Sequence, residues 1–182
     1  MKKILGVTLA LTALTVLALN VLVAVYRQNA NVFMNKAAQS GMAEVALGNL
    51  ALQKSQNGEI RRFAQMIVDD HTKANDELKS LASAKNVRLP AKVSSDQRSA
   101  ANKLNGISGA EIDKAFMRQM VKDHEAVVNL FQKQANSNDD ADLKAFAANH
   151  LPILQGHLQM ARSLSGSTKN SNSHQNINTN GN

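Results

Sequence analysis

Two histidines stand in helical series that are otherwise apolar. The series are Ile60, Phe63, Ile67, His71, Ala74, Leu78, Leu81 and Ile112, Phe116, Met120, His124, Val127, Phe131, Ala135. Steps of three and four residues place each series on one face of a helix, the face that points into a core. A buried polar group without a partner costs several kcal/mol. We therefore expect His71 and His124 to pair with other polar groups or to bind an ion.

Two further helical segments offer polar groups at comparable positions. Glu44 belongs to the series Phe33, Ala37, Ser40, Glu44, Leu47, Ala51. His150 and His157 are seven residues apart, so they share one face of the last helical segment. One ligand from each helix then gives a candidate set of four residues: Glu44, His71, His124 and His157.

This set predicts a metal site. Imidazole nitrogen and carboxylate oxygen bind divalent iron, zinc, manganese or copper, and helical bundles build such sites from facing helices. The alternative is a metal-free structural module, in which a buried polar network satisfies each histidine. The sequence contains no Glu-x-x-His and no His-x-x-x-His pair. The di-iron carboxylate signature is therefore missing, and both hypotheses stay open.

Two aspartates directly precede two of these histidines, as Asp70-His71 and Asp123-His124. Adjacent residues on a helix point about 100° apart, so each aspartate lies at the surface or pairs with a histidine of a neighbouring helix. No catalytic constellation is recognisable, because the chain has no cysteine, no glycine-rich phosphate loop and no serine beside a His/Asp pair. The sequence favours a protein that is not an enzyme.

The elements that position these side chains are helices, since no stretch alternates with the period of a strand. The pattern predicts long helices at 33–56, 59–85, 109–135 and 140–164 and a short helix at 95–105. Four long helices with one short crossover helix make an all-α four-helix bundle. Pro152 lies inside the last helix and should kink it.

An internal echo links the two halves of this bundle. Phe63 and His71 are separated by the same interval as Phe116 and His124, and both histidines follow an aspartate. The echo suggests duplicated helix pairs. We expect the two histidines to lie at matching points of two similar helix faces.

The N-terminus predicts export. Lys2 and Lys3 precede residues 4–26, which contain no charged residue. A helix of this length spans roughly 34 Å, enough for a hydrocarbon core near 30 Å, and the lysines favour an N-terminus on the inside. Cleavage after Ala24 or Ala30 is disfavoured by the residues before them. We expect residues 1–30 to be an uncleaved signal anchor with an apolar membrane helix at about 4–26, or alternatively a cleaved signal peptide.

The composition of the chain limits the kinds of partner that it could bind. The chain has 182 residues and a net charge of +7, from 21 Lys and Arg against 14 Asp and Glu. The basic residues are scattered, without an aromatic stacking set, so we expect no nucleic-acid partner. The absence of cysteine excludes disulfides and thiolate metal sites. Residues 166–182 are rich in Ser, Asn and Thr and are expected to be disordered.

Several short motifs resemble the bacterial DUF4142 family in their order and spacing. They are Gly41-Met42-Ala43-Glu44-Val45, Phe63-Ala64-Gln65, Asp70-His71, Leu89-Pro90, Ser108-Gly109, Asp123-His124 and Leu151-Pro152-x-Leu154-x-x-His157-Leu158. The resemblance implies a ferritin-like four-helix bundle at 31–165, an extracytoplasmic setting and no established activity. The bundle would lie in the periplasm, anchored to the inner membrane by residues 4–26 or released after cleavage. The polar positions of the family pattern coincide with Glu44, His71, His124 and His157.

One position departs from the family pattern. The chain reads Ile112-Asp113-x-x-Phe116 where the family usually reads Phe-Asp-x-x-Tyr. The substitution keeps the apolar character but loses a hydroxyl, which weakens any role of that position as a redox tyrosine. The resemblance implies no protein partner. The partner that the sequence predicts is the membrane, through residues 4–26.

Overall fold

The structure is a computed structural model that describes the backbone of residues 2–138 and 140–175. Side chains are described for Val21 and for residues 27–138 and 140–167. The elements are α1 (Lys2–Lys54), α2 (Gly58–Ala84), α3 (Ser95–Asn105), α4 (Ala110–Ala135) and α5 (Ala141–Gln175), and the described residues form no strand. The prediction of an all-α fold is confirmed.

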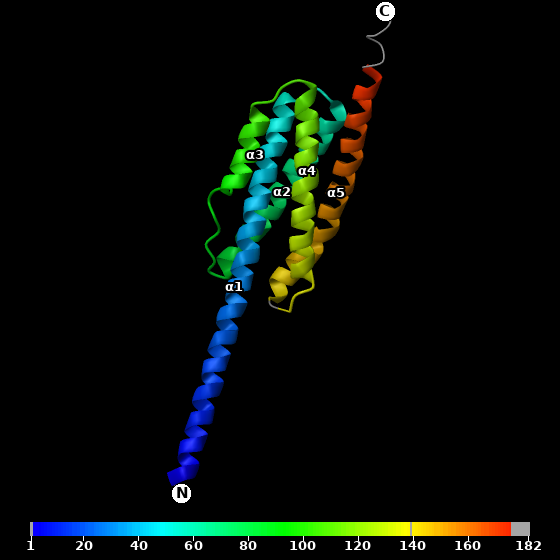
Figure 1. Cartoon of the computed structure of the whole chain (residues 1–182). Coiled ribbons are helices and arrows are strands. Elements are labelled where there is room, and N and C mark those ends of the chain that lie inside the picture. Colours follow the sequence, from blue (N-terminus) through cyan, green and yellow to red (C-terminus); the bar gives the residue numbers. More distant parts are fainter. Residues whose placement is uncertain (1, 139, 176–182) are drawn as a thin grey trace, which may run out of the picture.

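The helices form a bundle of two antiparallel pairs (Figure 1). α1 pairs with α2 and α4 pairs with α5, while α1 also packs against α4 and α2 against α5. α3 connects the two pairs and lies against α1 and α4. Each long helix therefore contributes one face to a common interior.

Residues at the helix ends satisfy backbone groups that the helices leave free. The side chain of Asn57 accepts a hydrogen bond from the N–H of Glu59 at the start of α2. Ser94 and Gln97 form a capping box at the start of α3. Gly109 has a φ of 62° just before α4, a conformation that glycine adopts readily. These local signals explain why the observed helix boundaries fall close to the predicted ones.

The first helix differs from the prediction, since no separate N-terminal apolar helix is found. α1 runs from Lys2 to Lys54, and its first half extends beyond the other helices (Figure 1). Residues 27–32 contain no glycine or proline, so nothing interrupts the helix there. Within the part of the chain that the structure describes, no helix is long and apolar enough to cross a membrane. Apart from Val21, the side chains of the expected anchor at 4–26 lie outside the described ones, and the anchor stays a prediction.

The last helix is longer than predicted. α5 continues from the expected end at residue 164 to Gln175, into the segment 166–182 for which the sequence predicts disorder. No proline follows Pro152, and extending an existing helix is easier than starting one. Residues 176–182 lie outside the described residues. Pro152 itself lies inside α5 without ending it.

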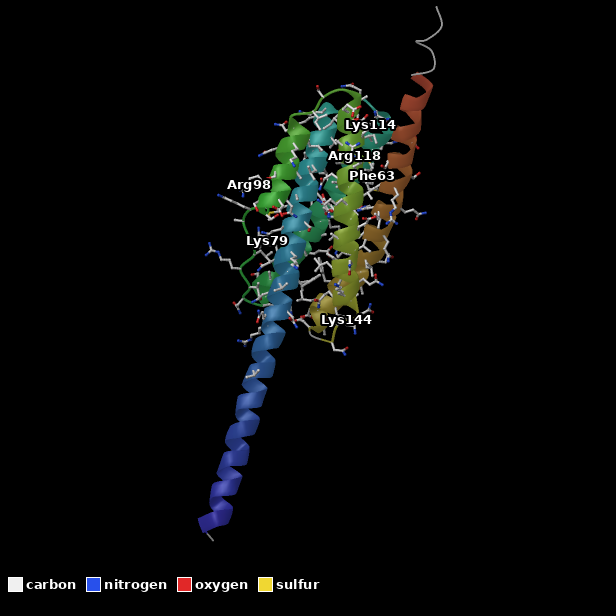
Figure 2. All side chains as sticks on the ribbon, viewed as in Figure 1. Phe63, Lys79, Arg98, Lys114, Arg118 and Lys144 are labelled. Atoms are coloured by element: carbon white, nitrogen blue, oxygen red, sulfur yellow. The ribbon has the colours of Figure 1, made fainter. Side chains whose placement is uncertain are left out.

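The two predicted helix faces point inward. Ala74, Leu81 and Ala135 are half-buried, and the other members of both series are buried. Figure 2 shows the side chains of Lys79, Arg98 and Lys144 on the outside of the bundle. The alternation of apolar and charged residues therefore sets how each helix is rotated about its axis.

Two apolar clusters fill the interior. The rings of Phe33, Phe131 and Phe146 pack in the first, with centroids 5.3 to 6.4 Å apart. Phe63 and Phe116 pack edge to face in the second, at 6.2 Å. Burying one large apolar side chain contributes about 1.5–3 kcal/mol, so these clusters hold the four long helices together. Polar residues lie between them.

Candidate metal centre

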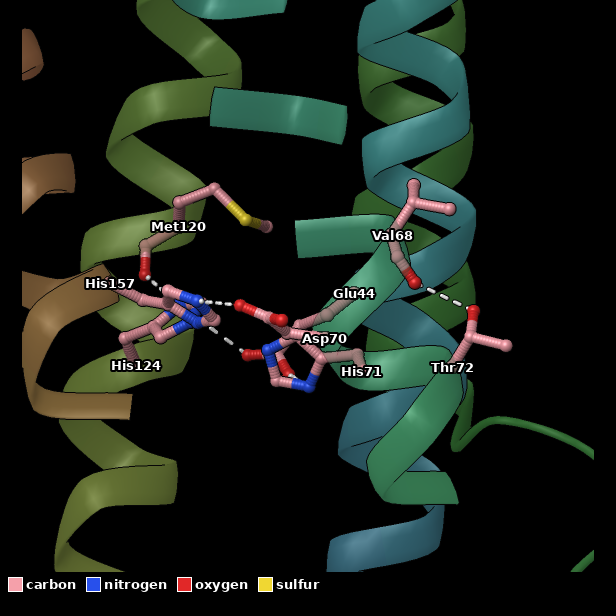
Figure 3. A network of polar contacts seen from close by, with 8 residues as sticks. All are labelled: Glu44, Val68, Asp70, His71, Thr72, Met120, His124 and His157. Carbon is pink, nitrogen blue, oxygen red and sulfur yellow. Dashed lines mark hydrogen bonds and ion pairs between the residues drawn. The ribbon is translucent and has the colours of Figure 1, made fainter. Parts of the chain in front are cut away.

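The four predicted ligands meet in one buried layer, which we call the histidine layer. It consists of Glu44 on α1, His71 on α2, His124 on α4 and His157 on α5, with exposed fractions of 1%, 5%, 0% and 3%. The centroids of the three imidazole rings lie 5.3 to 5.5 Å apart. One ring nitrogen from each histidine lies within 4.8 Å of the others. Figure 3 shows the rings and the carboxylate of Glu44 converging from different helices.

The internal echo accounts for part of this arrangement. Phe63 faces Phe116 in the second apolar cluster, and His71 faces His124 in the layer, with ring centroids 5.5 Å apart and nearly perpendicular. The matching residues of the two similar helices thus meet across the interior. The sequence prediction that both histidines point inward is confirmed.

Hydrogen bonds determine which nitrogen of two histidines carries the proton. His124 Nδ1 lies 3.0 Å from the backbone oxygen of Met120, and a carbonyl oxygen only accepts, so Nδ1–H donates. His157 Nε2 lies 2.9 Å from Asp70 Oδ2 and donates to that carboxylate. In the neutral rings, His124 Nε2 and His157 Nδ1 then carry lone pairs. These two atoms lie 3.3 Å apart, facing each other.

The other half of the layer contains polar atoms without a hydrogen-bond partner. His71 Nδ1 lies 3.0 Å from Glu44 Oε2, and His124 Nδ1 lies 3.5 Å from Glu44 Oε1. These are ion-pair distances, but within the described residues neither oxygen of Glu44 nor His71 Nε2 makes a hydrogen bond. Buried polar atoms of proteins are almost always satisfied. Three such atoms in one layer indicate a position that a bound ion would satisfy.

Burial sets the protonation of the layer. Burial first, and the neighbouring His157 second, lower the pKa of His124 from 6.5 to about 4, against the hydrogen bond to Met120, which raises it. Burial also lowers the pKa of His157, and it lowers the pKa of His71 well below its usual range, with the other histidines adding to the effect. Burial raises the pKa of Glu44 well above its usual range, and Asp123 adds to this. Near pH 7 the imidazoles are therefore neutral, which is the form that binds metal ions.

The separation of two of these nitrogens fits two ligands of one tetrahedral metal ion. Two nitrogens bound to one such ion at 2.0–2.1 Å lie about 3.3–3.4 Å apart, and His124 Nε2 and His157 Nδ1 are separated by 3.3 Å. His71 would supply a third nitrogen. The oxygens of Glu44 lie 3.0 Å from Nδ1 of His71 and 3.5 Å from Nδ1 of His124, and Glu44 does not belong to the group whose ligand atoms all lie within 4.8 Å of one another. Asp70 would orient His157 through its hydrogen bond, as carboxylates commonly do behind metal-bound histidines. This agrees with the expectation that Asp70 pairs with a histidine of a neighbouring helix.

One acid–histidine pair was missed by the sequence reasoning. His150 Nε2 on α5 lies 2.8 Å from Glu77 Oε2 on α2, and its ring packs on Phe146 at 4.5 Å. The signal that could have found it is spacing, because Glu77 follows Asp70 by seven residues and His150 precedes His157 by seven. Antiparallel helices place such positions at the same level. We call Asp70–His157 the inner rung and Glu77–His150 the outer rung.

A small cavity lies between the two rungs. Its volume is about 20 Å³, room for roughly one water molecule or ion. The lining includes Glu44, His71 and His157 of the layer, His150 of the outer rung and the half-buried Ala74. All four long helices contribute residues to the lining.

The chain belongs to the family described as a domain of unknown function, DUF4142, whose family model matches residues 24–164. No protein of curated description matches the chain.

Two solved structures have a similar fold. One is a DUF305 fragment from Deinococcus radiodurans, with a TM-score of 0.69 and 13% identity, over 76% of this chain and 96% of that chain. The other is CopM in its Cu(II)-bound form, with a TM-score of 0.64 and 16% identity, over 75% of this chain and 95% of that chain. At these identities the likeness shows the fold alone.

Proposed function

We propose that this protein binds one divalent transition-metal ion in the histidine layer. The observation that carries the proposal is the distance of 3.3 Å between His124 Nε2 and His157 Nδ1, since both atoms carry lone pairs when the rings donate to Met120 and Asp70. Two neutral nitrogens turned toward each other repel unless a cation lies between them, and the unpaired Nε2 of His71 is buried beside them. A metal ion would satisfy all three rings at once.

The ligand chemistry narrows the metal. Three imidazoles with the carboxylate of Glu44 suit zinc or copper better than iron or manganese, because affinity for nitrogen ligands rises toward copper. The charges of Glu44 and Asp70, when both are ionised, would balance a divalent ion. CopM, which shares the fold, has been obtained in a Cu(II)-bound form. We therefore place copper and zinc first among the candidate metals.

The proposed setting is extracytoplasmic, in the periplasm, with residues 4–26 as an anchor in the inner membrane or as a cleaved signal. The support is the uncharged stretch behind Lys2 and Lys3. The family match begins at residue 24, so it covers the bundle rather than this stretch. The ferritin-like label also belongs to the proposal, and its support is the crossover helix α3 between two helix pairs. Copper and zinc handling outside the cytoplasm would suit such a bundle.

Equilibrium binding tests the proposal. Protein without an affinity tag is stripped with a chelator and titrated with Zn²⁺ and Cu²⁺ in a calorimeter. We expect one ion per chain for the wild type and an affinity lowered by more than about 100-fold in His124→Ala, since even partners behind the ligands are worth 10–100-fold. Gln134→Ala is the control, because Gln134 is a buried polar residue of α4 that does not line the cavity, and it should bind like the wild type. An unmetallated wild type, or equal losses in both variants, would contradict the proposal.

The alternative is a structural bundle with a metal-free polar network. It is favoured by the hydrogen bonds that His124 and His157 already make to Met120 and Asp70. Thermal unfolding separates the two functions, because an ion that binds only the folded state raises the melting temperature as its concentration increases. A melting temperature that does not change with the concentration of Zn²⁺ or of Cu²⁺ would favour the structural bundle.

A further inference from the structure

The two acid–histidine rungs form a seam between α2 and α5. In the inner rung, Asp70 is 41% exposed while His157 is buried. In the outer rung, Glu77 is 45% exposed and His150 is 11% exposed. Each rung thus joins a carboxylate that water reaches to an imidazole that points into the bundle. The cavity between the rungs touches both imidazoles.

We propose that a divalent transition-metal ion reaches the histidine layer through this seam, with the Glu77–His150 pair as its first point of attachment. The inference rests on the proposed function and adds the route of the ion to it. His124 has no exposed surface and does not line the cavity, whereas Glu44, His71 and His157 do. Two solvent-accessible residues of its lining, Asp70 on α2 with 41% of its side chain exposed and Ile153 on α5 at 44%, place the open side of the cavity between α2 and α5.

The seam offers ligand chemistry along its length. Glu77 at the surface pairs with His150, and His150 lines the cavity of about 20 Å³ together with Glu44 and His157. Small residues keep the passage free. Ala74 lies on α2 midway between Asp70 and Glu77, and Gly41 of α1 leaves room for the amide of Asn75.

Gly41 and Asn75 form one wall of the passage. A Cβ atom on Gly41 would lie 2.0 Å from Asn75 Oδ1, so the amide occupies the notch that glycine leaves. Among the described residues Asn75 has no hydrogen bond that would hold it elsewhere. Asn75 lines the cavity together with Glu44 and His71.

The first test blocks the passage with a larger side chain. Ala74→Leu adds three carbons at the cavity wall, and Zn²⁺ uptake by stripped protein is followed by stopped flow with a competing zinc indicator. We expect Zn²⁺ loading to slow by about tenfold or more, because binding then requires a conformational opening of the protein. The dissociation constant at equilibrium should stay within about threefold of the wild-type value. Ala115→Leu is the control, since Ala115 is also half-buried but borders a different groove.

The second test changes the charge at the mouth. Glu77→Gln removes the outer carboxylate and should slow Zn²⁺ loading several-fold at low salt, with the difference fading at high salt. Glu125→Gln is the charge-matched control, because Glu125 is 52% exposed and paired with Arg162 on a different part of the surface. It should load at the wild-type rate.

The outcomes separate the two proposals. If the wild type binds no Zn²⁺, the metal function fails and the route fails with it. If the wild type binds Zn²⁺ and Ala74→Leu and Glu77→Gln both load at its rate, the route is overturned and the metal function stands. Should Ala74→Leu not fold, Asn75→Ala decides, since widening the passage must speed loading.

Discussion

The histidine layer and the layer one heptad below it show how one bundle cross-section differs from the next. Glu44, His71, His124 and His157 make up the first. Seven residues away along each helix stand Ala37, Leu78, Phe131 and His150, and all four are buried and line the same cavity. The helix register is the same in both layers, so the difference lies in the side chains alone.

The comparison shows that apolar packing and unpaired polar groups lie in different layers of the bundle. The lower layer is apolar except for His150, whose ring packs on Phe146 and whose Nε2 reaches Glu77 at the surface. The histidine layer buries polar atoms that have no hydrogen-bond partner in the described residues. Buried polar atoms of this kind cost stability. The metal ion proposed above would give these atoms partners.

The largest difference should appear when one side chain is truncated in each layer. Phe131→Ala leaves a large cavity in the apolar cluster and should lower the unfolding free energy by about 4 kcal/mol. His124→Ala removes a smaller ring and unpairs its neighbours, and should cost about 2 kcal/mol. Urea unfolding of metal-free protein measures both. A larger loss for His124→Ala would mean that the polar layer carries the stability.

Acid should weaken the histidine layer and leave the apolar layer unchanged. The pKa of His124 is about 4 in the folded protein against 6.5 when exposed. As the pH falls through this window, the unfolded chain binds a proton that the folded chain does not. The unfolding free energy should therefore fall by about 3 kcal/mol between pH 6.5 and pH 4 through His124 alone. The lowered pKa values of His71 and His157 act in the same direction.

Glu44 changes the unfolding free energy with pH in the opposite direction, so the share of His124 has to be measured as a difference between two proteins. Its raised pKa means that the folded protein keeps a proton which the unfolded chain releases, so its contribution is present at low pH and is lost as the pH rises. Urea midpoints of metal-free wild type and His124→Leu, measured from pH 4 to pH 7, isolate the share of His124. Parallel curves for the two proteins would show that His124 does not stay neutral.

Much of the fold could be predicted because helix periodicity is a local property. The apolar spacing around His71 and His124 fixed which way both rings point, and Asn57-Gly58 fixed a boundary. The continuity of α1 and the length of α5 were missed, since α1 continues through residues 27–32 without a break and α5 continues through Gly166, where the composition predicted a disordered tail. The outer rung and the ring tautomers depend on how two helices align, which no single helix pattern contains.

The two rungs should differ next in their effect on metal affinity. Asp70 holds His157 through its Nε2–H, so Asp70→Asn should weaken binding of Zn²⁺ by about tenfold, the usual effect of removing a carboxylate behind a metal ligand. Glu77→Gln should leave the equilibrium affinity unchanged, because His150 lies outside the layer. Calorimetry at pH 7 compares them. Equal losses in the two variants would place both histidines in one site.

The smallest effect concerns the stability that the outer rung provides. Glu77 is 45% exposed, and ion pairs at such positions contribute little, so Glu77→Gln should lower the unfolding free energy by less than about 0.5 kcal/mol. His150 would keep its packing on Phe146, with ring centroids 4.5 Å apart, because that contact does not depend on the carboxylate. Urea midpoints at low and high salt measure the change. A loss as large as that of His124→Ala would make the outer rung a structural pair, and the contrast between the two layers would then disappear.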